Sequence, residues 1–384
     1  MSFVYGGSTI NIAATGATDG TIGCFLKPPG FVGKVHIEPT INDIWDIAPS
    51  RFYNSVIASP LASRAWVLQE RLLSPRTLHF SKTELFWECW HCDASESFPN
   101  GLPEFENKHV FVRDRKPLSE IWHTIVRLYA AAKLSFRKDK MVAISGIARL
   151  VQKDTQDQCL AGLWRNDIEL QLLWYQLTPG KEFAEESRYL APSWSWASVD
   201  EREFLSYDPR IEENRYKYYA HVIDAHVVPA GNDPFGELVG GQLRMSCSVM
   251  LAGKQGRSKR GGGSDDTEVE IESADSEKEG FSIIPDSNGY DGEDICVLPV
   301  VNILREKDEW QGIRGLLLIP TGNKKGEYIR VGCFDLSLWG ASPGDQERFL
   351  KLLELCGKAT AEVQCAETLS EPEFSDERYI ITII

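Results

Sequence analysis

Apolar residues recur with two different periods along this chain of 384 residues. In the first half they recur every three or four residues, which is the spacing of an amphipathic helix. This spacing predicts helices over residues 60–73, 121–128, 141–151 and 160–177. In the second half apolar and polar residues alternate, which is typical of strands with one buried face. We expect strands over residues 216–228, 238–251, 295–303, 315–319, 328–334 and 379–383, and one helix over residues 343–356.

Local signals bound the first of these helices sharply. Ser59 is a favourable N-cap and Pro60 suits the first helical position, so we expect the helix to begin there. Pro75 disfavours the helical conformation at Ser74, which ends the helix at Leu73. Three short strands are predicted around this helix, over residues 8–14, 76–80 and 85–89.

Together these elements predict an α+β protein. It consists of a partial α/β unit, a helical block and a mainly antiparallel β domain, at residues 1–99, 100–184 and 185–384. We expect the helix over residues 60–73 to pack on a small sheet of the α/β unit.

A run of alternating tryptophans lies near the start of the predicted β domain. Residues 193–198 read as a strand that places Trp194 and Trp196 on one face. Such a pair also suits a stacking platform for a base or a sugar. We expect the two rings to pack in the core of the β domain instead.

One segment of the predicted β domain departs from the strand pattern. Residues 253–280 hold four basic residues near their start, then three consecutive glycines and eight acidic residues. Such a composition buries too little apolar surface to offset the entropy of ordering. We therefore expect a disordered acidic insertion that a short turn can replace. The basic residues also fit a nuclear-import signal, but we expect them to solvate a loop instead.

Charge and cysteine content narrow the classes of function. The chain has 41 basic and 56 acidic residues, a formal charge of −15, which repels nucleic-acid backbones and anionic lipid. Its nine cysteines are odd in number and scattered, which suits a reducing compartment. The N-terminus lacks the pattern of a secretory signal, and no segment has the length of a membrane span. We expect a cytoplasmic protein with free thiols, no membrane span and no nucleic-acid partner.

The segment Cys-Trp-His-Cys at residues 89–92 carries the spacing of a metal or redox pair. A structural zinc site needs four ligands, and no second closely spaced pair of cysteines is present. A redox pair would usually accompany a thioredoxin-like βαβ pattern, which does not occur around it. We expect buried thiols at a strand end and no metal site.

A longer motif covers the predicted helix and the strands after it. Residues 64–76 read Arg-Ala-Trp-Val-Leu-Gln-Glu-Arg-Leu-Leu-Ser-Pro-Arg, and residues 85–89 read Leu-Phe-Trp-Glu-Cys. This sequence resembles the closing half of the fungal heterokaryon-incompatibility (HET) domain. Leu-Ala-Gly-Leu-Trp at 160–164 and Ala-Pro-Ser-Trp-Ser-Trp-Ala-Ser at 191–198 resemble the region that accompanies this domain in large fungal members. The resemblance is densest over residues 1–99.

The chain departs from the family at its start. The family pattern opens with blocks resembling Ser-Tyr-Cys-Trp-Gly and Trp-Ile-Asp-x-Leu-Cys-Ile, and neither occurs here. We therefore expect the N-terminal half of the domain to be absent, because the gene model starts late or because the chain is a remnant. In a remnant, the strand over residues 8–14 would present an unpaired edge.

HET domains are similar to Toll/interleukin-receptor (TIR) domains, some of which cleave NAD with a glutamate four residues after a tryptophan. The resemblance implies that Glu70 is the catalytic carboxylate and that Trp66, Arg64 and Gln69 contribute to binding. Cleaving the bond between nicotinamide and ribose builds positive charge on the sugar, which a carboxylate stabilises. No Lys or Arg lies three or four residues from Glu70, which excludes an intrahelical ion pair. A tertiary partner such as Arg76 would make Glu70 a structural residue.

The resemblance further implies a protein of fungal allorecognition and regulated cell death, in which the HET portion is a toxic effector. NAD would be a substrate only when the domain is complete, and no bound cofactor is expected. A competing hypothesis is a non-catalytic remnant or scaffold that binds a protein partner or self-associates. A third is an enzyme that another fungal pathway has recruited from this family.

Overall fold

The structure of the chain is a computed structural model. It describes residues 2–26, 51–103, 117–176, 189–199, 204–205, 215–257, 267–272, 278–287, 289–290, 292–304, 311–336, 344–369 and 377–384. The chain divides into two compact units, Met1–Thr155 and Gln156–Ile384. The boundary between them lies inside the predicted helical block 100–184. Both helices and sheets occur, and a large, mostly antiparallel sheet dominates the second unit, which confirms the α+β class in this coarse sense.

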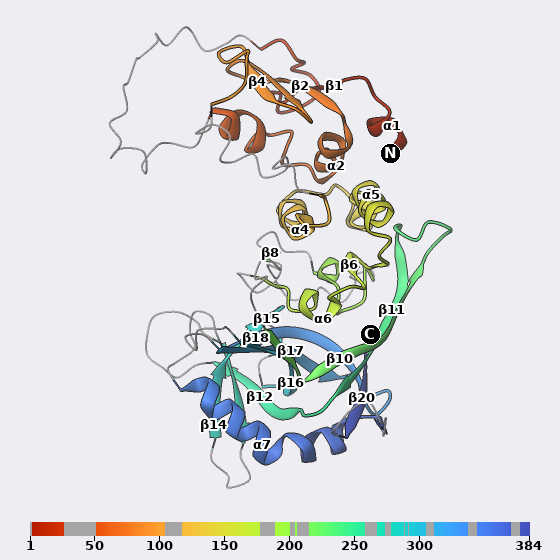
Figure 1. The fold of residues 1–384 in the computed structure, drawn as a ribbon, viewed down its shortest axis with the longest axis vertical. Helices are drawn as coiled ribbons and strands as arrows, with labels where there is room; N and C mark the ends of the chain where they lie inside the picture. The colour runs from red at the N-terminus through yellow and green to blue at the C-terminus, as the bar shows by residue number, and fades with distance from the viewer. Residues whose placement is uncertain are drawn as a thin grey trace. The chain divides into compact units, whose positions relative to one another are not determined.

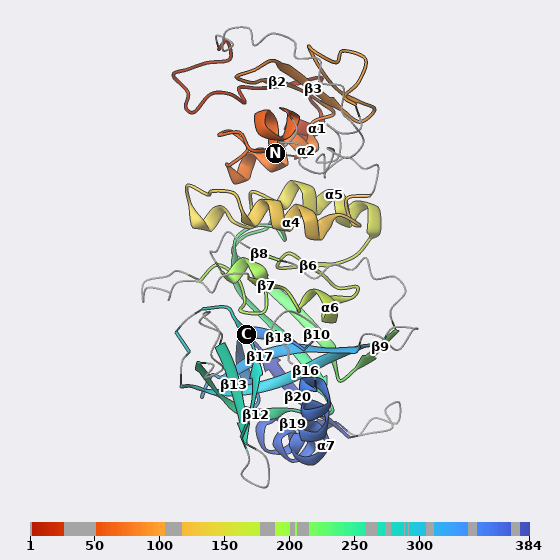
Figure 2. The same cartoon turned by 90° about the vertical axis from the view of Figure 1, so that its left-hand side faces the viewer.

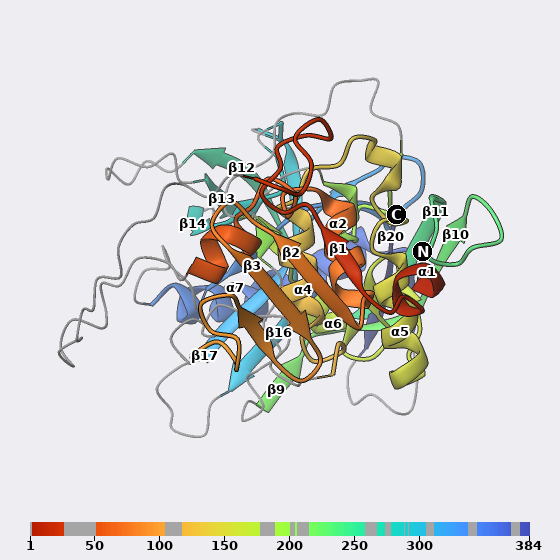
Figure 3. The same ribbon diagram turned by 90° about the horizontal axis from the view of Figure 1, so that it is seen from above.

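The first unit contains a sheet of four strands in the order β1-β2-β3-β4 (Figure 3). Their bounds are Asn11–Ala13, Arg76–Phe80, Leu85–Cys89 and Asp93–Ser95. β1 runs parallel to β2, and the other neighbours are antiparallel. The sequence predicted β2 and β3 with these bounds. Thr77 and His79 of β2 and Phe86 and Glu88 of β3 are buried, so this buried face carries polar side chains.

Short helices complete the first unit. They are α1 Ser2–Gly6, the π-helix η2 Tyr53–Ile57, α2 Ala65–Leu73, α4 Trp122–Ala130, the 3₁₀-helix η3 Arg137–Asp139 and α5 Ser145–Thr155. α2 contacts both α4 and α5. The side-chain oxygen of buried Gln69 in α2 accepts a hydrogen bond from the backbone N–H of Gly146 in α5 at 2.6 Å. A Cβ at residue 146 would lie 2.4 Å from that oxygen, so this contact requires glycine.

The helix predicted to begin at Pro60 begins later, at Ala65, with Arg64 as its N-cap. Ser59 does use its hydroxyl as a cap, but for a separate turn. Its oxygen accepts from the N–H of Ala62 at 3.1 Å and donates to the carbonyl of Val56 at 2.8 Å. The prediction of the helix start was therefore wrong, because Ser59 closes the turn after η2 instead of opening α2.

The second unit is built around a sheet of twelve strands. The main path runs β10-β11-β20-β18-β17-β16-β12-β13-β14, with β9, β15 and β19 paired to β16, β18 and β20. The bounds are β9 Arg215–Tyr218, β10 Ala220–Pro229, β11 Leu238–Cys247, β12 Leu251–Arg257, β13 Thr267–Glu272, β14 Lys278–Ser282, β15 Ile284–Pro285, β16 Asp294–Leu304, β17 Gln311–Pro320, β18 Glu327–Asp335, β19 Glu367–Leu369 and β20 Arg378–Ile383. The helix α7, Asp345–Gln364, packs on the sheet beside β12 (Figures 1 and 2).

The amphipathic helix predicted over residues 160–177 is absent. Its place is taken by β5 Cys159–Leu160, β6 Leu163–Trp164, the single turn α6 Ile168–Gln171 and β7 Tyr175–Gln176, which pairs with β8 Phe204–Leu205. Ala161 and Gly162 both have positive φ, 51° and 86°, which a right-handed helix cannot contain. The indole of Trp196 would lie 2.7 Å from a Cβ at residue 162, so this turn requires glycine.

The tryptophan run is buried as expected but is not a strand. Residues Trp196–Ser198 form the 3₁₀-helix η4, while Trp194 and Trp196 are 0% and 2% exposed. The run is held by hydrogen bonds to the β5–β6 turn, because Ser195 donates to the carbonyl of Ala161 at 2.6 Å and the indole N–H of Trp196 to that of Gly162 at 3.1 Å. The prediction of core packing was right, and the prediction of a strand was wrong.

The predicted disordered insertion over residues 253–280 contains ordered strands. β12, β13 and β14 lie in it, and residues 258–266 and 273–277 lie outside the described part of the chain. Val269 and Ile271 alternate with glutamates and are each 1% exposed. They join Phe281 of β14 and Phe349 of α7 in the core of this unit. The prediction was wrong for the described residues because charge obscured an alternation that buries one face.

This core position gives a prediction. Replacing Ile271 with valine should lower the free energy of unfolding by about 0.5–1.5 kcal/mol, because it removes one buried methylene. The matched control is Ile223→Val, since Ile223 is 41% exposed and should change stability by less than about 0.5 kcal/mol. Urea denaturation measures both. Equal, negligible effects would restore the view that residues 267–272 are dispensable.

Candidate functional site

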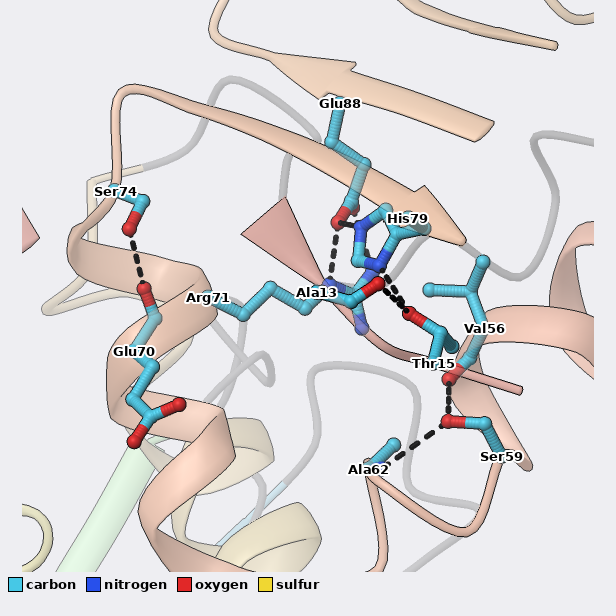
Figure 4. Close-up of polar contacts among 10 residues, drawn as sticks. All are labelled: Ala13, Thr15, Val56, Ser59, Ala62, Glu70, Arg71, Ser74, His79 and Glu88. Atoms are coloured by element: carbon cyan, nitrogen blue, oxygen red, sulfur yellow. Dashed lines mark hydrogen bonds and ion pairs between the residues drawn. The ribbon is translucent and has the colours of Figure 1, made fainter. Parts of the chain in front are cut away.

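The candidate site is a cavity of about 150 Å³ in the first unit. It lies between the β1 end, β2, α2 and the turn before α2, and its wall is formed by Asn11, Ile12, Ala13, Ala14, Thr15, Val56, Ser59, Leu61, Ala62, Val67, Glu70, Arg71, Thr77 and His79. The polar part of this wall comes from residues 11–15 and, more than forty residues later in the sequence, from residues 59–79. The fold therefore gathers a carboxylate, a guanidinium, an imidazole and hydroxyls around one small space (Figure 4).

A chain of hydrogen bonds runs through the buried groups beside the cavity. Arg71 of α2 binds Glu88 of β3 with two bonds of 2.6 Å, Nε to Oε2 and Nη2 to Oε1. His79 Nε2 lies 2.6 Å from Glu88 Oε2, and His79 Nδ1 lies 3.0 Å from Thr15 Oγ1. All four residues are at most 9% exposed. The sheet register makes this possible, because β2 and β3 place His79 and Glu88 on the same buried face.

The charges in this network balance each other. Burial alone would raise the pKa of Glu88, but Arg71 and His79 outweigh it and hold the pKa of this carboxyl well below its usual range. Burial would likewise lower the pKa of Arg71, and the Glu88 carboxylate raises it instead. Glu88 and Arg71 thus form a buried, bidentate ion pair, a geometry that satisfies both charges.

The imidazole of His79 links this ion pair to the cavity wall. An ionised carboxylate only accepts hydrogen bonds, so His79 Nε2 carries a hydrogen and donates a hydrogen bond to Glu88. The single proton of the Thr15 hydroxyl goes either to His79 Nδ1 or to the Ala13 carbonyl, which lies 3.3 Å away. The contacts of the two ring nitrogens with Thr15 and Glu88 fix the orientation of the imidazole ring.

One residue of the cavity wall, Thr77, carries a fully buried hydroxyl that has no hydrogen-bond partner among the described residues. A buried hydroxyl without a partner costs about 1–3 kcal/mol. The Thr77 hydroxyl is thus an unsatisfied polar group within a residue of the cavity wall.

Glu70 lies on the cavity wall but stays outside the ion-pair network. Its side chain points away from Arg71 (Figure 4). The hydroxyl of Tyr5 in α1 forms a hydrogen bond with it, and burial together with the Glu70 carboxylate raises the pKa of Tyr5 to about 12. Arg76, which the sequence offered as a partner, donates instead to the backbone carbonyl of Thr9 at 3.3 Å. The described partner of Glu70 is thus a phenol and not a cation.

The three residues expected to assist Glu70 lie elsewhere. Gln69 is buried against α5, where it holds the helix contact described above. Arg64 is exposed at the N-cap of α2, and Trp66 is half-buried. Among the described residues, the cavity wall includes none of these three side chains. The structure brings Glu70 to the cavity without Trp66, Arg64 or Gln69.

Cys89 and Cys92 were expected to be buried thiols, and this was wrong. Cys89 is half-buried and Cys92 is exposed, because both lie at the tip of the hairpin between β3 and β4. Within the residues that the structure describes, no three His, Cys, Asp or Glu side chains gather as a metal site would require.

A second hollow, of about 640 Å³, lies over β12, β13, β14 and β16 of the second unit. Four of its charged groups form two ion pairs. Lys254 lies 3.4 Å from Asp294 and Lys278 lies 3.7 Å from Glu270. These exposed pairs leave the first cavity as the better candidate.

Comparisons of the chain with protein families, with curated proteins and with solved structures found no match. Over the described part of the chain, no helix combines the length and the apolar character needed to cross a bilayer.

Proposed function

We propose that the chain is a HET-family protein of fungal allorecognition and regulated cell death, whose first unit belongs to a TIR-like effector that cleaves NAD with Glu70 when the domain is complete. The sequence motif at residues 64–76 supports the family, and the biology follows from that resemblance. The observation that carries the site is that Glu70 and Thr77, whose buried hydroxyl has no partner among the described residues, belong to the wall of the same cavity. Both lie next to a wall that the Arg71–Glu88 ion pair holds rigid.

The proposed chemistry uses the charge of Glu70. When the bond between nicotinamide and ribose breaks, positive charge develops on the sugar. A carboxylate fixed beside that sugar stabilises the transition state more than the ground state, which is the condition for a faster reaction. The hydroxyl of Tyr5 orients the carboxylate by hydrogen bonding to it. Thr77 supplies a hydrogen bond to a sugar hydroxyl.

The size of the cavity limits this proposal to one part of the substrate. Ligand pockets usually have volumes of about 300–1,000 Å³, and this cavity has about 150 Å³. It has room for a single ring, so the remainder of a dinucleotide must bind other surface. A second copy of the chain or a protein partner would supply that surface, in keeping with an effector that acts on association.

The direct test is Glu70→Gln in fungal cells that produce the chain within a complete HET domain. Cell growth and cellular NAD should both fall with the complete wild-type domain and not with the chain alone, and Glu70→Gln in the complete domain should reduce the rate of NAD loss by about tenfold or more, as expected for the loss of one electrostatic stabiliser. Glu120→Gln is the matched control, because Glu120 is exposed and does not line the cavity. It should behave as wild type.

A second candidate function is a non-catalytic scaffold that binds a protein or self-associates. The specific observation in its favour is that Tyr5 and Gly146 already occupy Glu70 and Gln69 as structural partners. On this alternative Glu70→Gln leaves NAD unchanged and alters only stability. Unchanged NAD in cells producing the complete wild-type domain would therefore contradict the effector proposal and favour the scaffold.

A further inference from the structure

Cys89 and Cys92 are placed to form a disulfide with little movement. Their sulfurs lie 3.8 Å apart at the tip of the β3–β4 hairpin. The backbone N–H of Cys89 donates to the carbonyl of Cys92 at 3.0 Å, which continues the pairing of Glu88 with Asp93. Residues opposed in this way have Cα atoms about 4.5–5.5 Å apart, inside the range of about 4.4–6.8 Å that a disulfide spans. Side-chain rotation alone can bring the sulfurs together.

The two thiols are also accessible and unequal in character. Cys92 is exposed, Cys89 is half-buried, and Trp90 between them is 59% exposed. Burial alone would raise the pKa of Cys89, but hydrogen bonds from the backbone of His91 and Cys92 and from neighbouring side chains lower it below the usual thiol value. Burial and the neighbouring Cys89 raise the pKa of Cys92. Cys89 is therefore the better nucleophile and Cys92 the resolving thiol.

The chain contains a comparison pair with the same sulfur separation. Cys247 and Cys365 also lie 3.8 Å apart, but they are 0% and 3% exposed. A hydrogen bond to Cys365 and burial raise the pKa of Cys247 well above its usual value. The two cysteine pairs thus have the same distance between their sulfurs, but they differ in the solvent accessibility of the thiols and in the direction in which the thiol pKa is shifted.

We propose that Cys89 and Cys92 form a thiol–disulfide exchange site that reacts with low-molecular-weight disulfides. The Cys89 thiolate attacks one sulfur of the small disulfide, forms a mixed disulfide and displaces the other half as a thiolate. Cys92 loses its proton to solvent and attacks the Cys89 sulfur, which displaces the second small thiolate. The protein pair loses two electrons and two protons, and the small disulfide gains them as two thiols. The product is a Cys89–Cys92 bond across the hairpin.

This site is independent of the proposed NAD chemistry. Neither Cys89 nor Cys92 belongs to the cavity wall formed by the described residues. The hairpin does continue from Glu88, so the exchange site adjoins the strand that holds Arg71. Each proposal can fail without the other.

The test uses the reduced full-length chain and glutathione disulfide without oxygen. Free thiols are then alkylated, and the cysteine peptides are mapped by mass spectrometry. The peptide with Cys89 and Cys92 should lose two hydrogen atoms as the disulfide forms. This oxidation should be at least about tenfold faster than formation of a glutathione adduct on Cys159, because burial raises the pKa of Cys159 to about 12. Cys247 and Cys365 should remain reduced.

Two variants decide the order of the steps. Cys92→Ser should stop the reaction at a stable glutathione adduct on Cys89, because no resolving thiol remains. Cys247→Ser is the matched control and should leave oxidation of the hairpin unchanged. An oxidised pair at Cys247 and Cys365 before the hairpin, or no Cys89 adduct in a folded Cys92→Ser variant, would overturn the proposal. Circular dichroism of each variant verifies the fold.

Discussion

Replacing Glu88 with glutamine should lower the free energy of unfolding of the first unit by about 3–5 kcal/mol. Arg71 is only 9% exposed and would lose its charged partner. A buried charge without a partner keeps the cost of leaving water and gains no attraction in return. Urea denaturation gives the size of the loss. Hydrogen exchange in β2 and β3 assigns the loss to this unit.

Two further variants and pH test the cause. Glu120→Gln, which changes an exposed carboxylate, should alter stability by less than about 0.5 kcal/mol. Adding Arg71→Met to Glu88→Gln removes the orphaned charge and should recover more than half of the loss. The pKa of Glu88 is lower in the folded protein than its ordinary value of 4.5. The contribution of Glu88 to the free energy of unfolding is therefore complete above pH 4.5 and is lost as the pH falls through the pKa of the folded state. A gap between wild type and Glu88→Gln that stays constant under acid would contradict this origin.

Arg330→Met should destabilise the second unit by a similar amount, about 3–5 kcal/mol. The Arg330 side chain is 0% exposed and lies 3.3 Å from both Asp286 and the centre of the Trp174 ring. It also donates to the backbone carbonyls of Leu172 and Trp174 at 3.2 and 2.6 Å. Burial already raises the pKa of Asp286 to about 6 in spite of Arg330. Methionine fills the space but leaves this carboxyl and both carbonyls without their donor.

The matched control is Arg244→Met. Arg244 lies 2.9 Å from Glu367, but the two side chains are 41% and 64% exposed, and water replaces such a pair readily. This variant should lose less than about 1 kcal/mol. Thermal unfolding measures both variants under the same conditions. Equal losses in the two variants would show that burial does not govern the contribution of Arg330.

Secondary structure was predictable where local signals and packing agreed. β2 and β3 were predicted with their observed bounds, because Pro75 precedes the first and a polar turn separates the two. The helix over residues 160–177 failed because its apolar spacing is helical while Ala161 and Gly162 adopt positive φ. That conformation depends on the distant Trp196, which packs against the turn. A sequence window cannot contain this contact.

The candidate site was predictable only in part. Glu70 was identified through the motif of α2, and the structure places it on the cavity wall. Arg71 and His79 were missed, because their relation to Glu88 depends on the register of β2 and β3 and on the helix above them. One signal was present in the sequence. Glu88 shares the face of Phe86 in an alternating strand, and a charge on a buried face requires a partner.

The position of β20 has a consequence for synthesis of the protein. In the sheet β20 lies between β11 and β18, although it follows both in the sequence. At a translation rate of about 5–20 residues per second, β11 leaves the ribosome several seconds before its neighbour exists. During that interval β11 and β18 both present open edges, which are sites of aggregation. A premature stop codon between α7 and β20 would therefore split the sheet through its middle, so the truncated product should become a substrate for chaperones and proteases.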